Sequence, residues 1–197
     1  MINFSKTFTT DFIHCGKIDL PWDKVKKDLE SVADDQTKLI SIVGHNSLIN
    51  EELYNLQNEC AKYGYTQHNT KLWKTTNGIE PKLTFDWEQD INNQLPLDYT
   101  IATVTRQDPG QVLPWHVDRY FFLKNQYPND PRPIWRFLMF MEDWKIGHIV
   151  QVKNSVFTHW KQGDVITWQP GEESLHVTAN IGLEKKWTCN ITGFLTV

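Results

Sequence analysis

Two periodicities divide the chain. Up to about residue 96, apolar residues recur at steps of three and four, which predicts amphipathic helices. From Tyr99 onward apolar and polar residues alternate, as they do in strands that bury one face. We expect helices over 21–35, 48–65 and 85–96, with short strand-like runs at 38–43 and 70–75.

The second half contains eight strand-like runs separated by glycine and Pro-Gly turns. Eight short strands at such spacing predict a sandwich or barrel, and doubling the sheet hides edges that would otherwise pair with other chains. We therefore expect an α+β fold: a double-stranded β-helix (a cupin-like jelly roll) over 97–197, with N-terminal helices from 1–96 packed on one sheet in a single compact domain. The runs are 99–107, 111–118, 134–142, 147–153, 155–160, 164–169, 175–181 and 186–197.

Composition narrows the range of partners. The chain has 197 residues, of which 40% are hydrophobic, enough for one sizeable core. Its formal charge of −4 is spread without a basic stripe, which argues against a nucleic-acid partner. No apolar stretch is long enough to span a membrane and no signal-peptide pattern is present, so we expect no membrane partner. Three widely spaced cysteines without a CxxC favour a reducing cytoplasm.

The clearest candidate chemistry lies in "LPWHVD". On a strand His116 and Asp118 would emerge on the same face, about 6.6 Å apart along the backbone. His176, in another expected strand, is the natural third ligand of a metal site. Two imidazoles and a carboxylate leave coordination positions open, and without a thiolate they suit iron(II) better than structural zinc. The plainer alternative is a rim ion pair with Arg119, with His176 a hydrogen-bonded core residue.

Two cationic residues occupy expected strands. Lys186 would share a face of the last strand with Thr188 and Asn190, where burial is costly unless an anion pairs with the ammonium. Arg136 interrupts an apolar run and would either face the same cavity or extend to its rim. Two cations near one cavity suggest an acidic ligand there. The alternative places Lys186 in a solvated turn.

Together these residues resemble a known family. His116-x-Asp118, His176, and a basic residue ten positions further, Lys186, with Thr188 two beyond it, form the pattern of 2-oxoglutarate- and iron(II)-dependent dioxygenases. Over about 97–197 the sequence is most similar to the aspartyl/asparaginyl β-hydroxylase and free-proline hydroxylase branch. The resemblance implies iron(II) on the two histidines and the aspartate, with 2-oxoglutarate and O2 as co-substrates.

The resemblance also implies roles for the cations. Lys186 and Thr188 would hold the far carboxylate of 2-oxoglutarate, and Arg136 would help bind that carboxylate or an acid group of the substrate. The implied reaction hydroxylates a C–H bond of an amino acid or protein residue and releases succinate and CO2. Two details matter: lysine stands where the family usually has arginine, and the presence of Asp118 disfavours a halogenase.

Two other functions are compatible with the same pattern. A cupin-like module would bind a metal or small molecule without redox turnover, and a structural jelly roll would use the His-x-Asp pair only as a rim contact. We expect a small-molecule or peptidyl substrate if the protein is an enzyme.

Overall fold

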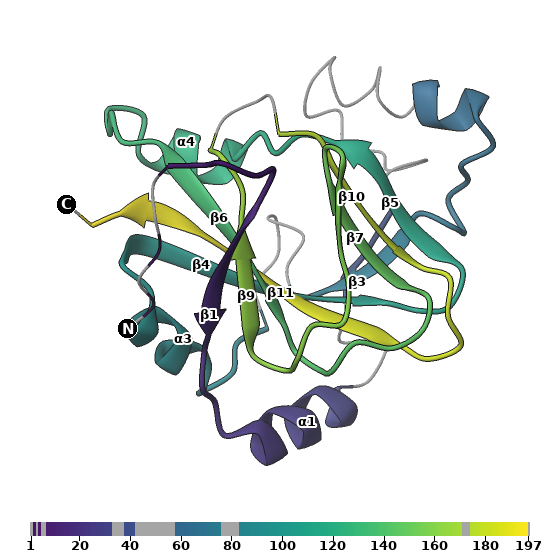
Figure 1. The fold of residues 1–197 in the computed structure, drawn as a ribbon, viewed down its shortest axis with the longest axis horizontal. Helices are drawn as coiled ribbons and strands as arrows, with labels where there is room; N and C mark the ends of the chain where they lie inside the picture. The colour runs from purple at the N-terminus through teal and green to yellow at the C-terminus, as the bar shows by residue number, and fades with distance from the viewer. Residues whose placement is uncertain are drawn as a thin grey trace.

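The computed structural model describes residues 2, 4, 7–32, 38–41, 58–75, 83–170 and 174–196. Two antiparallel sheets form the body of the protein (Figure 1). Its helices are α1 (Trp22–Ser31), α3 (Glu88–Gln94) and α4 (Phe121–Gln126). Its strands are β1 (Ile13–Lys17), β2 (Lys38–Ser41), β3 (Lys71–Lys74), β4 (Leu97–Gln107), β5 (Gln111–His116), β6 (Ile134–Phe140), β7 (His148–Val152), β8 (Ser155–Phe157), β9 (Asp164–Thr167), β10 (His176–Asn180) and β11 (Lys186–Leu195).

The expected double-stranded β-helix is confirmed. The seven-stranded sheet has the order β1-β9-β6-β11-β4-β3-β2, and the four-stranded sheet has the order β5-β10-β7-β8. Each of the eight expected runs became one of the strands β4 to β11, and these strands are divided equally between the two sheets.

The N-terminal region contains strands as well as helices, and two of these strands, β2 and β3, lie in the strand-like runs expected at 38–43 and 70–75. It supplies β1, β2 and β3, which extend the larger sheet at both edges by pairing with β9 and β4. Strand β1 was not predicted, because five residues with a register shift at Gly16 (φ 101°) show no usable period. The division of the chain at residue 96 stays a prediction. The expected helix 48–65 lies largely outside the described residues, although 58–62 are helical.

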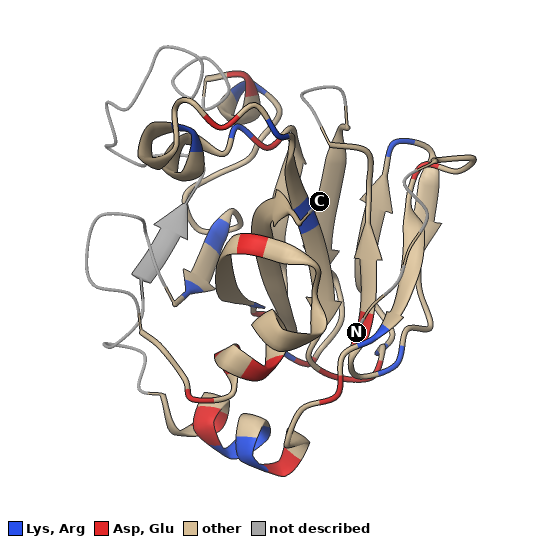
Figure 2. Cartoon of the chain, turned by 90° about the vertical axis from the view of Figure 1, so that its left-hand side faces the viewer, with Lys and Arg blue, Asp and Glu red and all other residues tan. Residues whose placement is uncertain are grey.

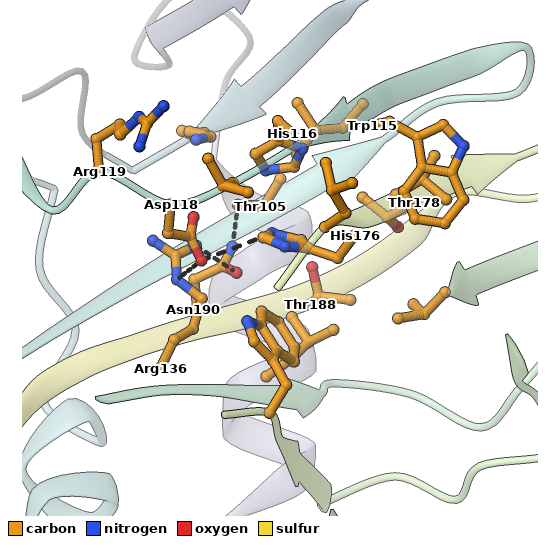
Figure 3. Close-up of a pocket in the computed structure, with 18 of the residues that line it drawn as sticks. Thr105, Trp115, His116, Asp118, Arg119, Arg136, His176, Thr178, Thr188 and Asn190 are labelled. Carbon is orange, nitrogen blue, oxygen red and sulfur yellow. Dashed lines mark hydrogen bonds and ion pairs between the residues drawn. The ribbon is translucent and has the colours of Figure 1, made fainter. Parts of the chain in front are cut away.

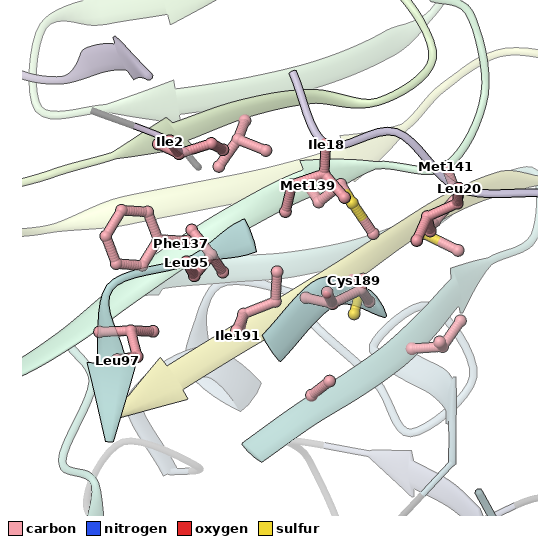
Figure 4. Close-up of a cluster of buried hydrophobic side chains, with 14 of the residues drawn as sticks. Ile2, Ile18, Leu20, Leu95, Leu97, Phe137, Met139, Met141, Cys189 and Ile191 are labelled. Atoms are coloured by element: carbon pink, nitrogen blue, oxygen red, sulfur yellow. The ribbon is translucent and has the colours of Figure 1, made fainter. Parts of the chain in front are cut away.

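The main hydrophobic core lies on the outer face of the seven-stranded sheet. Alternate residues of β11, including Cys189 and Ile191, pack there against Phe137 and Met139 of β6 (Figure 4). Helix α1 adds Val25 and Leu29 to the same cluster, and α3 adds Ile91. The N-terminal helices α1 and α3 therefore pack on one sheet, as expected, and leave its other face to the second sheet.

A smaller core lies between the two sheets. Leu138 and Phe140 of β6 pack there against Val150 and Val152 of β7, with Trp160 beside them. Alternation along β6 and β11 directs Arg136, Thr188 and Asn190 toward this space as well. The region between the sheets is therefore apolar in one part and lined by polar side chains in another.

Charged residues are concentrated on helices, turns and strand ends (Figure 2). Lysines and acidic residues lie side by side on α1, and the two sheets are mostly uncharged. Among the described residues, no helix has the length and apolar character needed to cross a membrane.

Candidate functional site

Two histidines meet at the ends of neighbouring strands. His116 is the last residue of β5, His176 is the first of β10, and the two are direct partners in the antiparallel ladder. Between this pair and the next, Leu113 with Thr178, β5 carries one extra residue. This irregularity contains Pro114, which has no N–H to donate, and such a bulge redirects the side chains that follow it. The two imidazole rings lie 4.1 Å apart between centroids.

Asp118 reaches the histidines from a turn. The expectation that it continues the strand is wrong, because β5 ends at His116 and the chain turns toward α4 through Tyr120, whose φ is 53°. The carboxylate nevertheless points back to the strand ends, with Oδ2 3.6 Å from His176 Nε2. One ligand atom from each of His116, Asp118 and His176 lies within 4.8 Å of the others (Figure 3).

Backbone carbonyls orient both imidazoles in the same way. Nδ1 of His116 lies 2.8 Å from the Pro114 carbonyl oxygen, and Nδ1 of His176 lies 2.9 Å from that of Ser174. When Nδ1 donates a proton to each carbonyl, Nε2 keeps its lone pair for another partner. Burial, followed by the neighbouring His176, lowers the pKa of His116 to about 3. Burial likewise lowers the pKa of His176, so both rings are neutral near pH 7.

The carboxylate of Asp118 is buried but stays ionised. Burial by itself would raise its pKa, but the Arg136 guanidinium and then the two histidines hold the pKa below its usual value. Arg136 Nε lies 2.8 Å from Asp118 Oδ2, and its Nη1 donates to Asn190 Oδ1 at 3.2 Å. Asn190 Nδ2 in turn donates to Thr105 Oγ1 at 3.2 Å. An ion pair followed by two hydrogen bonds, across three strands, thus fixes the carboxylate (Figure 3).

The donor set fits a divalent metal. A metal needs deprotonated ligands, and the surroundings supply two neutral imidazoles with free Nε2 atoms and one carboxylate. The carbonyl contacts at Nδ1 are the partners that metal-bound histidines usually have. Two nitrogens and one oxygen on one side of an ion favour iron(II) over a closed zinc site.

The three residues open onto a cavity of about 430 Å³ between the sheets. Of the other expected site residues, it brings Arg136 and Thr188 to the same wall. Trp115 and Leu175 contribute apolar surface, and their side chains are 40% and 49% exposed. Asp118 and His176 are therefore buried in the cavity wall, while Trp115 and Leu175 reach solvent.

Lys186 lies elsewhere. It is 1% exposed and is not among the residues that line the cavity. Its ammonium donates to the carbonyl oxygens of Ile149 at 2.6 Å and Ala179 at 3.2 Å, to Gln107 Oε1 at 3.2 Å, and to the Thr178 hydroxyl. These contacts join the last strand to the smaller sheet. Its role, and that of Thr188 and Arg136, in binding a co-substrate stays a prediction.

Sequence analysis missed several residues of the cavity. Lys74 lines it from β3, and Thr105 lines it from β4, where the two are ladder partners. Trp168 packs against the His176 ring, with centroids 4.6 Å apart. Lys74 lies in a four-residue strand far from the His-x-Asp motif, and only the register of β3 on β4 reveals that it belongs to the site.

No protein-family model matches the sequence, and the comparison with curated proteins gives no match. Several solved structures are similar to this chain at low sequence identity. One is a viral collagen prolyl hydroxylase from Paramecium Bursaria Chlorella virus-1 (10% identity, TM-score 0.47, 95% of this chain and 97% of that chain covered). A second is a Pseudomonas putida prolyl-4-hydroxylase (13% identity, TM-score 0.46, 95% of this chain and 86% of that chain covered). A third is a predicted oxalate decarboxylase from Thermotoga maritima (11% identity, TM-score 0.42, 83% of this chain and 98% of that chain covered).

Proposed function

We propose that this protein is a non-haem iron(II)- and 2-oxoglutarate-dependent oxygenase that hydroxylates a C–H bond. One observation supports the proposal most directly: two neutral imidazoles and one ionised carboxylate converge at the inner end of a cavity between two sheets. His116, Asp118 and His176 would hold the iron. A rim ion pair does not explain why Asp118 and His176 are buried at 8% and 6% exposure.

The reaction balances with O2 and 2-oxoglutarate as co-substrates. The bond between C1 and C2 of 2-oxoglutarate breaks and C1 leaves as CO2. One oxygen atom of O2 enters the new carboxylate of succinate, and the other is inserted into the C–H bond to give an alcohol. Bound iron(II) would supply the redox chemistry and the open coordination positions that the co-substrates need.

The protein's own side chains would orient the metal ligands and exclude water from them. Arg136 keeps Asp118 ionised and aimed at the histidines, and the carbonyls of Pro114 and Ser174 keep both Nε2 atoms unprotonated. Trp168 packs on the His176 ring from the interior, which limits water access from that side. These contacts would fix the ligands before a metal arrives.

We further propose an amino acid or a protein residue as the substrate. This rests on the resemblance of 97–197 to the aspartyl/asparaginyl β-hydroxylase and free-proline hydroxylase branch. The cavity volume of about 430 Å³ fits a small co-substrate together with one side chain, and its open mouth would admit a residue that is part of a longer chain.

An anaerobic titration tests the proposal. Adding iron(II) and then 2-oxoglutarate should produce a weak visible charge-transfer band, and admitting O2 should release succinate. Asp118→Ala and His176→Ala should lose the band and the succinate, while His68→Ala, at an exposed histidine outside the cavity, should keep both. Metal uptake without the band would indicate a cupin-like binding module. No metal uptake would contradict the metal site itself.

A further inference from the structure

Lys74 is a basic group on the described part of the cavity wall whose position the metal site does not explain. Its ammonium has no hydrogen-bond or ion-pair partner among the described residues, although it lies deep enough for burial to perturb it. We propose that Lys74 receives a carboxylate in this cavity, so that strand β3 of the N-terminal region, rather than Lys186, supplies the cation for an acidic ligand. The inference deepens the proposed function and rests on it only for the identity of that acid.

The position of Lys74 follows from strand register. Lys74 is paired with Thr105 on β4, and Thr105 is paired with Thr188 on β11. Residues that are direct ladder partners share one face of a sheet, so the three form a row across the cavity wall. All three line the cavity. Lys74 stands at one end of this row, and a charged donor with two hydroxyls beside it on one wall is a suitable receptor for a carboxylate.

The hydroxyl of Thr105 is oriented for a ligand. It accepts a hydrogen bond from Asn190 Nδ2 at 3.2 Å, which leaves its own proton available to donate. The Asp118–Arg136–Asn190 chain therefore ends at the row that contains Lys74. The metal ligands and the carboxylate receptor would be joined by one hydrogen-bonded network.

The other cations of the molecule's interior are already engaged. Arg136 pairs with Asp118 and donates to Asn190. Lys186 is surrounded by four oxygen acceptors and does not line the cavity. An acid that reached Lys186 would have to displace these acceptors, and at Arg136 it would share the guanidinium with Asp118. Among the described residues, Lys74 has no partner to exchange.

The charge balance of the cavity also favours an anion. Among the described lining residues, Lys74, Arg119 and Arg136 are cationic and Asp118 is the single carboxylate. A divalent metal would add to this excess of positive charge. Lys74 is partly buried, and a partly buried cation without a counter-ion among the described residues favours the binding of an anion. Burial, then Arg136, lowers the pKa of Lys74 to about 8, while Asp118 opposes the shift.

The test uses the full chain, first without metal and then loaded with manganese(II), which does not turn over. Binding of glutarate and 2-oxoglutarate is measured by calorimetry and by the shift in Tm. Lys74→Met should weaken binding about 10–100-fold, as expected when a charged hydrogen bond is lost. Lys74→Arg should restore most of the affinity. Lys71→Met, on the same strand but outside the cavity, controls for net charge, and Lys186→Met tests the competing cation.

Two comparisons identify the source of the carboxylate. If Lys74→Met weakens the binding of 2-oxoglutarate but not the binding of 2-oxobutyrate, which lacks the second carboxylate, Lys74 holds the far carboxylate of the co-substrate. The second comparison uses the variant loaded with manganese and 2-oxoglutarate. If it binds 2-oxoglutarate normally but no longer binds N-acetyl-L-aspartate more tightly than N-acetyl-L-asparagine, the acid belongs to the substrate. Unchanged affinity for all these acids in Lys74→Met overturns the proposal.

The proposed function can fail separately. If the manganese-loaded wild type bound no 2-oxoglutarate, the oxygenase proposal would fail, while glutarate binding to the metal-free protein would still decide the role of Lys74. Circular dichroism of each variant checks folding. Removing an ammonium that has no partner among the described residues should not unfold the protein.

Discussion

Arg136 lies directly behind the metal-facing carboxylate, with its Nε 2.8 Å from Asp118 Oδ2. Both side chains are largely buried, at 20% and 7% exposure, so the pair is only weakly screened by solvent. The arginine therefore acts on the metal site through the aspartate, as a positioning residue. Its presence in an otherwise apolar strand has a physical explanation that does not need a ligand.

Replacing Arg136 should weaken metal binding without removing a ligand. Arg136→Met leaves the carboxylate buried and unpaired, which raises the pKa of Asp118 and frees its rotation. We expect affinity for manganese(II) or iron(II) to fall about 10–100-fold. Isothermal titration at pH 7 measures this. Tyr120→Phe is the matched control, because it removes only a long contact of 3.4 Å to the same oxygen, and it should change affinity only a few-fold. Equal effects of the two variants would contradict this role.

The stability contribution of Lys186 should depend on pH. Burial lowers the pKa of Lys186 well below its ordinary value, while Glu142 opposes the shift. Between that lowered pKa and the unfolded value of about 10.4, the unfolded state binds more protons, so the contribution of Lys186 to stability rises with pH. Relative to Lys186→Met, the wild type should gain up to about 1.4 kcal/mol per pH unit in this window. Urea unfolding of the wild type and of Lys186→Met from pH 7 to 10 measures this gain. A stability difference between the two proteins that does not change with pH would contradict the prediction.

Carboxylate binding at Lys74 should weaken in alkaline solution. The ammonium binds an anion only when protonated, and the pKa of Lys74 in the free protein is lowered to about 8. Arg119, Arg136, Asp118 and the two histidines face the same cavity. The lowered pKa values of Asp118 and of both histidines keep their charges constant from pH 7 to 9.5. Glutarate affinity should therefore fall by about tenfold per pH unit above 8. Calorimetry on the metal-free protein measures it, and Lys74→Met should show no such slope.

Two turns touch backbone to backbone at Gly147 and Gly182. A Cβ at Gly147, where φ is 90°, would lie 2.3 Å from Gly182 N. Gly147→Ala should therefore lower the free energy of unfolding both through its positive φ and through overpacking. Gly110, with φ of 83° and nothing within 4 Å of a built Cβ, isolates the first effect. We expect Gly110→Ala to lower the free energy of unfolding by about 1–2 kcal/mol. Gly147→Ala should lower it by about 1–3 kcal/mol more. Denaturant unfolding measures both variants. Equal losses of unfolding free energy would contradict the overpacking at Gly147.

The sequence determined the double sheet because alternation is a local property. Each strand of the jelly roll carries its own period of two and its own turn residues, so β4 to β11 could be located without any knowledge of their partners. The same alternation predicted that Thr188 and Asn190 share one face of the last strand, and the structure places both on the cavity wall. The metal-ligand candidates were visible for a related reason, since His116 and Asp118 are close in sequence.

Only the tertiary structure decided which cations lie in the cavity and how the ligands are held. Ladder register places His176 opposite His116 and Lys74 beside Thr105, and register depends on pairing between distant segments. Lys186 lies on the inner face that the pattern predicted, yet its long side chain extends to the oxygens of the smaller sheet instead of the cavity. Alternation fixes the face from which a side chain leaves a strand, whereas the partner it reaches is set by packing between the sheets.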